Sequence, residues 1–125
     1  MFTMRATIKG KQPRLPFALI AEHVLGKKYQ LDLVLCSSTL SRRLNKTYRG
    51  KDTPTNILSF PLSENEGEIF IDVRKARSQA KRFGRSETDF ILFLFIHGVL
   101  HLKGLSHGSR MEELERKIEK KFRPH

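Results

Sequence analysis

The chain has 125 residues, of which 38% are hydrophobic, and its 24 Lys and Arg outnumber 13 Asp and Glu to give a net charge of +11. A single domain spanning residues 1–125 is expected, with a core large enough to fold without crosslinks, and the single cysteine, Cys36, excludes an intrachain disulfide. The N-terminus lacks a signal-peptide pattern and no apolar run reaches the ~18 residues of a membrane span, which indicates a cytoplasmic protein without a membrane partner.

Turn residues and hydrophobic periodicity divide the chain into four strands and four or five helices. The strands are expected at residues 2–9, 30–36, 56–60 and 67–73. The helices are expected after Pro13 and Pro16 up to Gly26, from Ser37 or Ser38 to Tyr48, and at 74–83, 87–103 and 109–122. Because these elements do not alternate regularly enough for a doubly wound sheet, we predict an α+β fold, a small mixed four-stranded sheet packed with four to five helices.

Local signals add detail to this layout. The helix at 87–103, capped by Ser86, is apolar nearly all round and should be the central, buried helix. The first helix should turn a side that includes Leu19 toward the core. Residues 49–54 should form a loop, and the strand after it should end at Pro61. Cys36 lies in an apolar stretch and is expected to be a small buried side chain.

Three of the five histidines, His97, His101 and His107, lie close together in the sequence. Residues four apart share one face of a helix, so His97 and His101 should be neighbours. Gly104 can adopt the left-handed conformation that ends a helix, which would let His107 return toward the other two. Three imidazoles leave an open coordination position, as in catalytic metal sites, and they suit one Zn²⁺ ion or another divalent metal.

The helix that carries the first two histidines is similar to the metal-site helix of zincins, whose signature is His-Glu-x-x-His. Gly98 stands in place of the Glu that acts as general base in metalloproteases, which disfavours a protease. We expect Gly98 instead to remove bulk beside His97. The alternative to a metal site is a set of three unrelated histidines, and neither His23 nor His125 is expected to be a ligand.

Three separate motifs resemble the YbeY family of metal-dependent endoribonucleases, over residues 45 to 114. The family signature His-Gly-x-Leu-His-Leu-x-Gly-x-Asp-His is matched at His97, Gly98, Leu100, His101, Leu102, Gly104 and His107. An Asn-x-x-Tyr-Arg motif and the Pro-Thr-Asp-Val-Leu-Ser-Phe-Pro-like segment after it are matched at Asn45, Tyr48, Arg49, Pro54, Thr55, Leu58, Ser59, Phe60 and Pro61. The stretch Gly67-Glu68-Ile69 is similar to the family's Gly-Asp-Ile.

Two positions depart from the family pattern. Ser106 stands where the family has an Asp before the last histidine, and Asn56 stands where Thr-Asp-Val is usual. Serine can accept a hydrogen bond but carries no charge, and groups that orient metal ligands affect affinity and activity. Glu112 and Glu113, in the last helix, are candidates to supply the missing carboxylate.

The resemblance implies metal-assisted cleavage of single-stranded RNA, in ribosomal RNA processing and ribosome maturation or quality control. It makes His97 and Arg49 the catalytic candidates, and the planar guanidinium of an arginine suits a phosphate. The implied metal is one Zn²⁺ ion bound by the three histidines. The implied partners are ribosomal RNA and the small ribosomal subunit, with a ribosomal protein or a ribosome-assembly GTPase as further candidates.

The positive net charge predicts a polyanionic partner, and nucleic acid is the abundant polyanion of the cytosol. Two stretches without acidic residues are the expected contacts to RNA: Arg42, Arg43, Lys46, Arg49 and Lys51, then Arg74, Lys75, Arg77, Lys81 and Arg82. The alternative is that each stretch is a solvated face. A second hypothesis for function is a ribosome-assembly factor that binds RNA and protein and has a structural or weakly active metal site.

Overall fold

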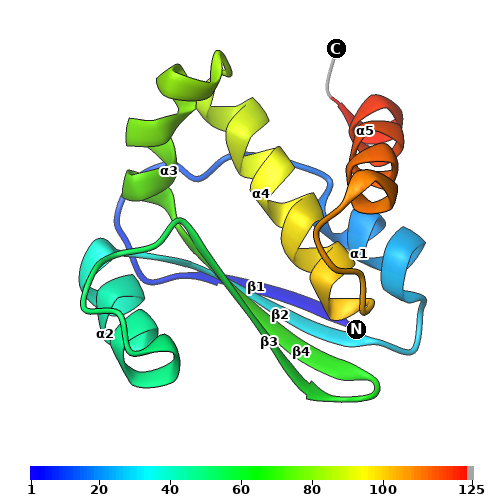
Figure 1. The fold of residues 1–125 in the computed structure, drawn as a ribbon, viewed down its shortest axis with the longest axis horizontal. Coiled ribbons are helices and arrows are strands. Elements are labelled where there is room, and N and C mark those ends of the chain that lie inside the picture. The colour runs from blue at the N-terminus through cyan, green and yellow to red at the C-terminus, as the bar shows by residue number, and fades with distance from the viewer. Residues whose placement is uncertain (124–125) are drawn as a thin grey trace.

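The computed structural model describes residues 1–123 and contains one mixed sheet with helices on both of its faces (Figure 1). The strands are β1 (Phe2–Ala6), β2 (Gln30–Cys36), β3 (Ile57–Ser63) and β4 (Glu66–Asp72). The helices are α1 (Phe17–Leu25), α2 (Ser38–Arg49), α3 (Val73–Ala80), the 3₁₀ turn η1 (Lys81–Phe83), α4 (Glu87–Leu102) and α5 (Ser109–Phe122). The predicted α+β fold with a four-stranded mixed sheet is confirmed.

The strand order in the sheet is β1-β2-β4-β3. The strands β1, β2 and β4 run parallel, whereas β3 pairs antiparallel with β4 and lies at an edge. The helices α1, α3 and α4 pack on one face and α5 packs outside α4, while α2 lies at the other face (Figure 1). Within residues 1–123, no helix has the length and apolar character to cross a membrane.

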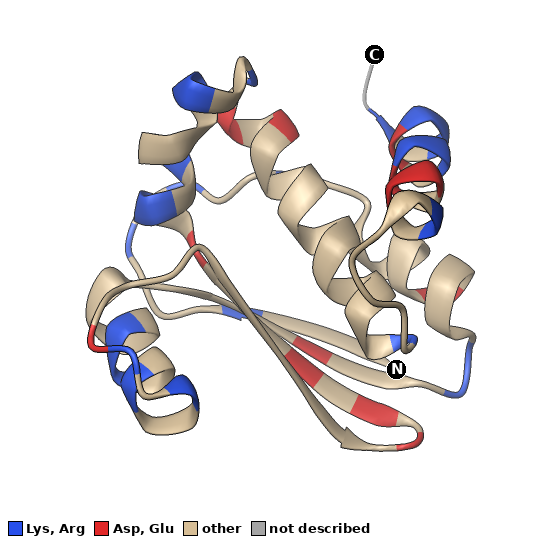
Figure 2. Cartoon of the chain, in the orientation of Figure 1, with Lys and Arg blue, Asp and Glu red and all other residues tan. Residues whose placement is uncertain are grey.

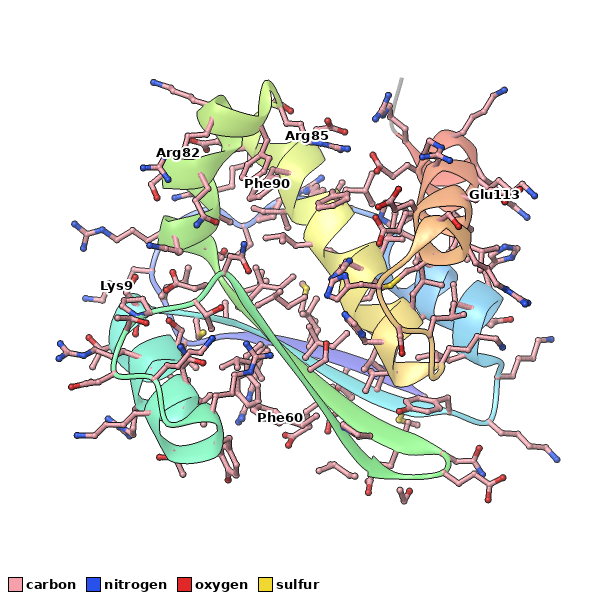
Figure 3. The ribbon with its side chains drawn as sticks, viewed as in Figure 1. Lys9, Phe60, Arg82, Arg85, Phe90 and Glu113 are labelled. Atoms are coloured by element: carbon pink, nitrogen blue, oxygen red, sulfur yellow. The ribbon has the colours of Figure 1, made fainter. Side chains whose placement is uncertain are left out.

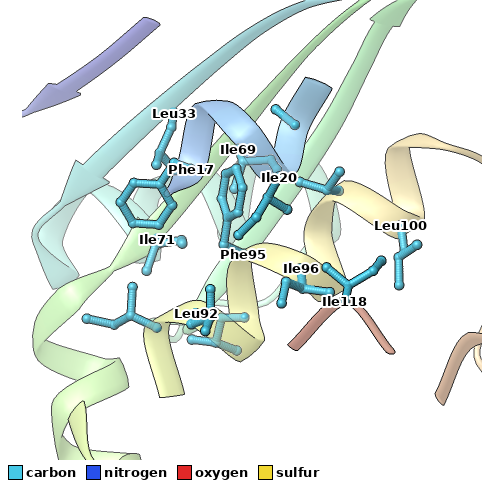
Figure 4. Close-up of a cluster of buried hydrophobic side chains, with 14 of the residues drawn as sticks. Phe17, Ile20, Leu33, Ile69, Ile71, Leu92, Phe95, Ile96, Leu100 and Ile118 are labelled. Atoms are coloured by element: carbon cyan, nitrogen blue, oxygen red, sulfur yellow. The ribbon is translucent and has the colours of Figure 1, made fainter. Parts of the chain in front are cut away.

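The core lies between α4 and the sheet, as the apolar character of α4 predicts. Leu33 of β2 and Ile69 and Ile71 of β4 are fully buried and meet Leu92 and Phe95 of α4 (Figure 4). Burying one such side chain contributes about 1.5–3 kcal/mol. At the N-terminus of α4, the hydroxyl of Ser86 accepts a hydrogen bond from the backbone N–H of Asp89 at 3.1 Å, which confirms the predicted cap.

The helix α4 lies close to the sheet at Gly98. A Cβ atom built there would lie 2.8 Å from both Ile57 Cδ1 and Ser59 Oγ of β3, and 3.2 Å from Ile69 Cδ1 of β4. The Ser59 hydroxyl also donates a hydrogen bond to the Gly98 carbonyl at 3.3 Å. We expected Gly98 to remove bulk beside His97, and the structure adds that this glycine faces the strands and allows the helix to lie against them.

A buried polar cluster holds α2 against the ends of the strands. Asp72 is fully buried and accepts hydrogen bonds from Ser41 Oγ at 2.7 Å and from the Lys75 backbone N–H at 2.9 Å. The Thr55 N–H donates to Ser41 Oγ at 3.3 Å, and Asn45 Nδ2 donates to the Thr53 carbonyl at 2.9 Å. These contacts give the Asp72 carboxylate and the Ser41 hydroxyl hydrogen-bond partners inside the protein, and they attach the loop after α2 to the sheet.

Cys36 lies beside this cluster, in register with Asp72. It is fully buried, as predicted from its apolar neighbours. Burial and, to a smaller extent, the Asp72 carboxylate raise the pKa of its thiol to about 12. The thiol is therefore protonated at neutral pH, which is the inert form of cysteine.

Three local predictions are corrected by the structure. Strand β3 continues through Pro61 to Ser63, because an edge strand tolerates a residue without a backbone N–H. Leu19 is 61% exposed, and α1 instead buries Phe17, Ile20, Ala21 and Val24. Arg49 is the last residue of α2 rather than part of the loop, and Gly50 ends the helix with φ 70°.

We expect Gly98→Val to destabilise the fold by about 1–3 kcal/mol, because a branched side chain cannot fit between α4 and β3 without displacing packed neighbours. Thr88→Val is the control, since Thr88 is exposed in the first turn of the same helix. Urea unfolding followed by circular dichroism measures both variants. Equal unfolding midpoints for Gly98→Val and the unsubstituted protein would show that the close approach is not required.

Candidate metal centre

The three predicted histidines meet at the C-terminal end of α4. His97 and His101 lie one turn apart on the helix, and His107 lies in the loop between α4 and α5. The two Nε2 atoms of His97 and His101 are 3.1 Å apart, and one nitrogen from each of the three rings lies within 4.8 Å of the others. Within residues 1–123, this is the only group of three or more His, Cys, Asp or Glu residues with such a geometry.

The loop that returns His107 depends on a tight turn after α4. The Gly104 N–H donates to the His101 carbonyl at 2.9 Å, and the Leu105 N–H donates to the Leu100 carbonyl at 3.1 Å. Gly104 has φ +102°, a conformation that residues with a side chain rarely adopt. The centroids of the His107 and His97 rings are 4.9 Å apart, so the return predicted from the glycine is confirmed.

Glu115 of α5 contacts the histidine group through His97. Its Oε1 atom lies 2.8 Å from Nδ1 of His97, and the Glu115 side chain is only 9% exposed. A carboxylate at this position favours the tautomer with a proton on Nδ1, which leaves Nε2 free to bind a cation. A residue of another helix therefore orients the His97 ring and favours one of its tautomers.

The sequence alone pointed to the wrong carboxylates. Glu112 and Glu113 are exposed, and Glu113 pairs with Lys117 at 3.3 Å and points outward from α5 (Figure 3). Glu115 could have been recognised because it lies one turn after Met111, on the side of the helix that the apolar residues assign to the core. An acidic residue on that side requires a partner, and His97 is that partner.

The surroundings of His101 favour the neutral form of its ring. Burial lowers its pKa below the usual value for histidine, and the neighbouring rings of His97 and His107 add to the effect. A neutral imidazole is the form that binds metals. The donor set of three converging imidazoles, one of them held by a carboxylate, therefore fits a divalent cation of the later transition series.

A cleft of about 340 Å³ opens beside the histidines. Its walls are formed by Arg49, Thr55, Asn56, Ile57, Ser59, His97, Gly98, His101 and His107. Arg49 is the only Lys or Arg among these described residues, so the structure brings the predicted catalytic arginine and the histidines to one cleft. The amide of Asn56 donates to Gln79 Oε1 at 2.9 Å, which ties this wall to α3.

The basic residues that we predicted to contact RNA lie mainly on exposed surfaces of α2 and α3 (Figure 2). Arg42 pairs with Asp52 at 2.8 Å, and Arg77 pairs with Glu87 at 3.3 Å, so both of these charges are partly balanced. Arg82 projects outward from η1 (Figure 3). Basic residues at and just after α5 were not predicted to contact RNA: Arg110, Arg116, Lys117, Lys120 and Lys121 in the helix, and Arg123 directly after it (Figure 2).

The two remaining histidines do not join the group. His23 is exposed on α1, and its ring packs against Phe122 with centroids 5.5 Å apart. His125 lies outside the described residues. Ser106, which replaces the family's Asp, is exposed in the loop just before His107.

Comparisons with known proteins agree with these features. Residues 11–123 match the sequence model of the family described as Endoribonuclease YbeY. A protein named Endoribonuclease YbeY from Aquifex aeolicus is 37% identical over 114 residues, covering 86% of this chain and 73% of the relative. One of the same name from Geobacter sulfurreducens is 30% identical over 138 aligned positions, covering 96% of this chain and 92% of the relative. A solution structure of a Thermotoga maritima protein has a TM-score of 0.69 and 28% identity, covering 96% of this chain and 88% of that one.

We expect Glu115→Ala to weaken the binding of Zn²⁺ about 10- to 100-fold, because His97 loses the group that sets its tautomer and ring position. In Glu115→Gln the amide oxygen can still accept a hydrogen bond from Nδ1 of His97, so this variant should lose less affinity for Zn²⁺ than Glu115→Ala. Competition with a chromogenic chelator measures the affinity. Glu112→Ala, one turn earlier and exposed, is the control and should bind Zn²⁺ normally. If Glu115→Ala bound Zn²⁺ with normal affinity, Glu115 would contribute only to the packing of α5.

Proposed function

Because the chain belongs to the YbeY endoribonuclease family, we propose that it is an endoribonuclease that cleaves single-stranded RNA at the cleft beside His97, His101 and His107. The names of its relatives support hydrolysis of RNA. We propose further that the three histidines bind one divalent ion, with Zn²⁺ as the first choice.

The observation that carries this proposal is the common cleft of Arg49 and the three histidines. Attack on a phosphodiester spreads negative charge over the phosphoryl oxygens, and the rate depends on groups that stabilise this charge. A planar guanidinium can donate two parallel hydrogen bonds to such a group. Arg49 belongs to a different element from the histidines, so a phosphate in the cleft would be bound from two sides.

Each residue has a distinct role in this mechanism. The histidines would hold the ion, which when bound supplies Lewis-acid catalysis. Glu115 keeps the His97 ring oriented, and Arg49 binds the phosphoryl oxygens and stabilises their charge in the transition state. Gly98 occupies the position at which zincins carry a Glu base, so a protease mechanism has no corresponding group.

Ribosomal RNA is the substrate that we propose, in ribosome maturation or quality control in the cytoplasm. The support is family membership together with the net charge of +11, which attracts polyanions. The exposed basic residues of α2 and α3 would contact phosphates beyond the cleft. The proposed partners are the small ribosomal subunit and a ribosomal protein or assembly GTPase, and residues 1–125 would act as one domain.

Replacing His97 by Ala should abolish detectable RNA cleavage, because both the ion and the order of the cleft depend on this ring. Removing divalent ions from the unsubstituted protein with a chelator should have the same effect, reversed by added Zn²⁺. Digestion of a labelled single-stranded RNA measures cleavage. The control is His23→Ala, an exposed histidine outside the group, which should cleave normally.

Two outcomes of this experiment would contradict the proposal. Cleavage that continues in His97→Ala would show that the histidine group is not the active site. A protein that binds RNA tightly but cleaves none, with or without added metal, would favour the alternative of a ribosome-assembly factor with a structural or weakly active metal site.

Arg49→Ala should lower kcat about 10²- to 10³-fold, since it removes a donor to the charge that develops on the phosphoryl oxygens. Arg49→Lys should restore little of this rate, because an ammonium group lacks the planar two-donor geometry. Steady-state kinetics on a short RNA separates kcat from KM. Arg43→Ala, an exposed neighbour on α2 that does not line the cleft, should change KM more than kcat. A change confined to KM in Arg49→Ala would make Arg49 a binding residue only.

A further inference from the structure

An exposed aromatic residue stands directly beside Arg49. Tyr48 lies in the last turn of α2 and is 66% exposed, although its ring is in contact with the sheet. The ring centroids of Tyr48 and Phe60 are 5.0 Å apart with a tilt of 56°. Phe60 in turn meets Phe70 edge to face at 5.9 Å. The three rings form an aromatic cluster whose outermost member, Tyr48, keeps most of its surface open to solvent.

This aromatic cluster and the metal cleft share strand β3. Ser59 lines the cleft and bonds to the Gly98 carbonyl, and side chains of successive strand residues point to opposite faces. Phe60 therefore lies on the face away from α4 (Figure 3). Because β3 is an edge strand, a chain that leaves the cleft can pass around its free edge and reach Tyr48 without crossing the sheet.

The charges around the aromatic cluster differ between its two sides. On the side of α2, the exposed residues Lys46, Arg49 and Lys51 attract phosphates (Figure 2). On the side of the sheet, Phe60 is in register with Glu68, which is in register with Asp32. These carboxylates repel phosphates, so a polyanion would approach Tyr48 along α2.

We propose that Tyr48 is a stacking subsite for a nucleobase of single-stranded RNA, next to the nucleotide whose phosphate contacts Arg49. This inference rests on the proposed endoribonuclease function. An aromatic ring backed by other rings and flanked by basic residues is the arrangement by which proteins hold single strands without reading their sequence. Bases within a duplex are already stacked on both sides, so this subsite would favour single-stranded over double-stranded substrates.

Binding of a short single-stranded RNA, with divalent ions removed so that no cleavage occurs, tests the inference. Tyr48→Ala and Tyr48→Leu should each bind about 5- to 100-fold more weakly, because a stacked base loses its aromatic partner. Tyr48→Phe should bind within about twofold of the unsubstituted protein, since the ring remains. Anisotropy of an end-labelled RNA measures all of these affinities. The control is Leu62→Ala, which removes another exposed apolar side chain from the same strand.

Tyrosine fluorescence supplies an independent measurement. The chain has two tyrosines and no tryptophan, and Tyr29 is buried at 8% exposure, so an RNA base that stacks on Tyr48 should quench the more exposed emitter. Quenching should persist in Tyr29→Phe and disappear in Tyr48→Phe, although the latter still binds RNA. Unfolding midpoints near that of the unsubstituted protein would show that the exposed substitutions leave the fold intact.

The possible failures can be told apart. Unchanged RNA affinity in Tyr48→Ala and Tyr48→Leu would overturn the stacking subsite and leave the proposed function in place. It would indicate that the exposed ring of Tyr48 contacts a protein partner instead of RNA. RNA that binds and quenches Tyr48 but is never cleaved would overturn the proposed function and keep the subsite. Absence of RNA binding by the unsubstituted protein would overturn both.

Discussion

The contact between α4 and the edge strand β3 at Gly98 is the constraint on which the site depends. With no side chain at this position, the backbone of α4 lies against Ile57 and Ser59. The same approach places His97, just before Gly98, and His101, three residues after it, in the wall of a cleft. The other wall of this cleft includes residues of β3 and of the loop before it. A side chain at this position would meet Ile57 and Ser59, so α4 and its histidines could not lie as close to β3.

The opposite side of α4 is held by α5 through two buried acids. Glu115 and Glu119 lie one turn apart on α5, and as whole residues, backbone included, they are 7% and 5% exposed. Glu115 meets His97, and Glu119 accepts a hydrogen bond from Arg85 Nη1 at 2.8 Å. The Arg85 guanidinium also lies 4.6 Å from the centre of the Phe93 ring. Buried charges of this kind are costly unless paired, so correct pairing selects one position of α5 along α4. That position is the one that brings Glu115 to the histidine group.

Local patterns predicted a large part of this architecture. The bounds of β2 and α5 agree with those expected, because alternation in one and a continuous apolar side in the other are properties of neighbouring residues. The histidine group was predictable for the same reason, since its spacing is short and Gly104 marks the turn. Contacts between distant segments were not predictable: Pro61 is tolerated only because β3 is at the edge, and the pairing of Glu115 with His97 depends on how α5 docks. The buried contacts of Asp72 with Ser41 likewise join segments about thirty residues apart.

Pro61 has a consequence beyond the bounds of its strand. A sheet edge carries unpaired backbone groups that can recruit a strand from another molecule and begin aggregation. In β3 the proline removes one donor, and the pairing with β4 becomes irregular between Pro61 and Ser63. A strand from another molecule could therefore not form a continuous ladder of backbone hydrogen bonds with this end of β3. The edge beside the cleft can thus stay open to solvent, accessible to a ligand, while self-association through the backbone is discouraged.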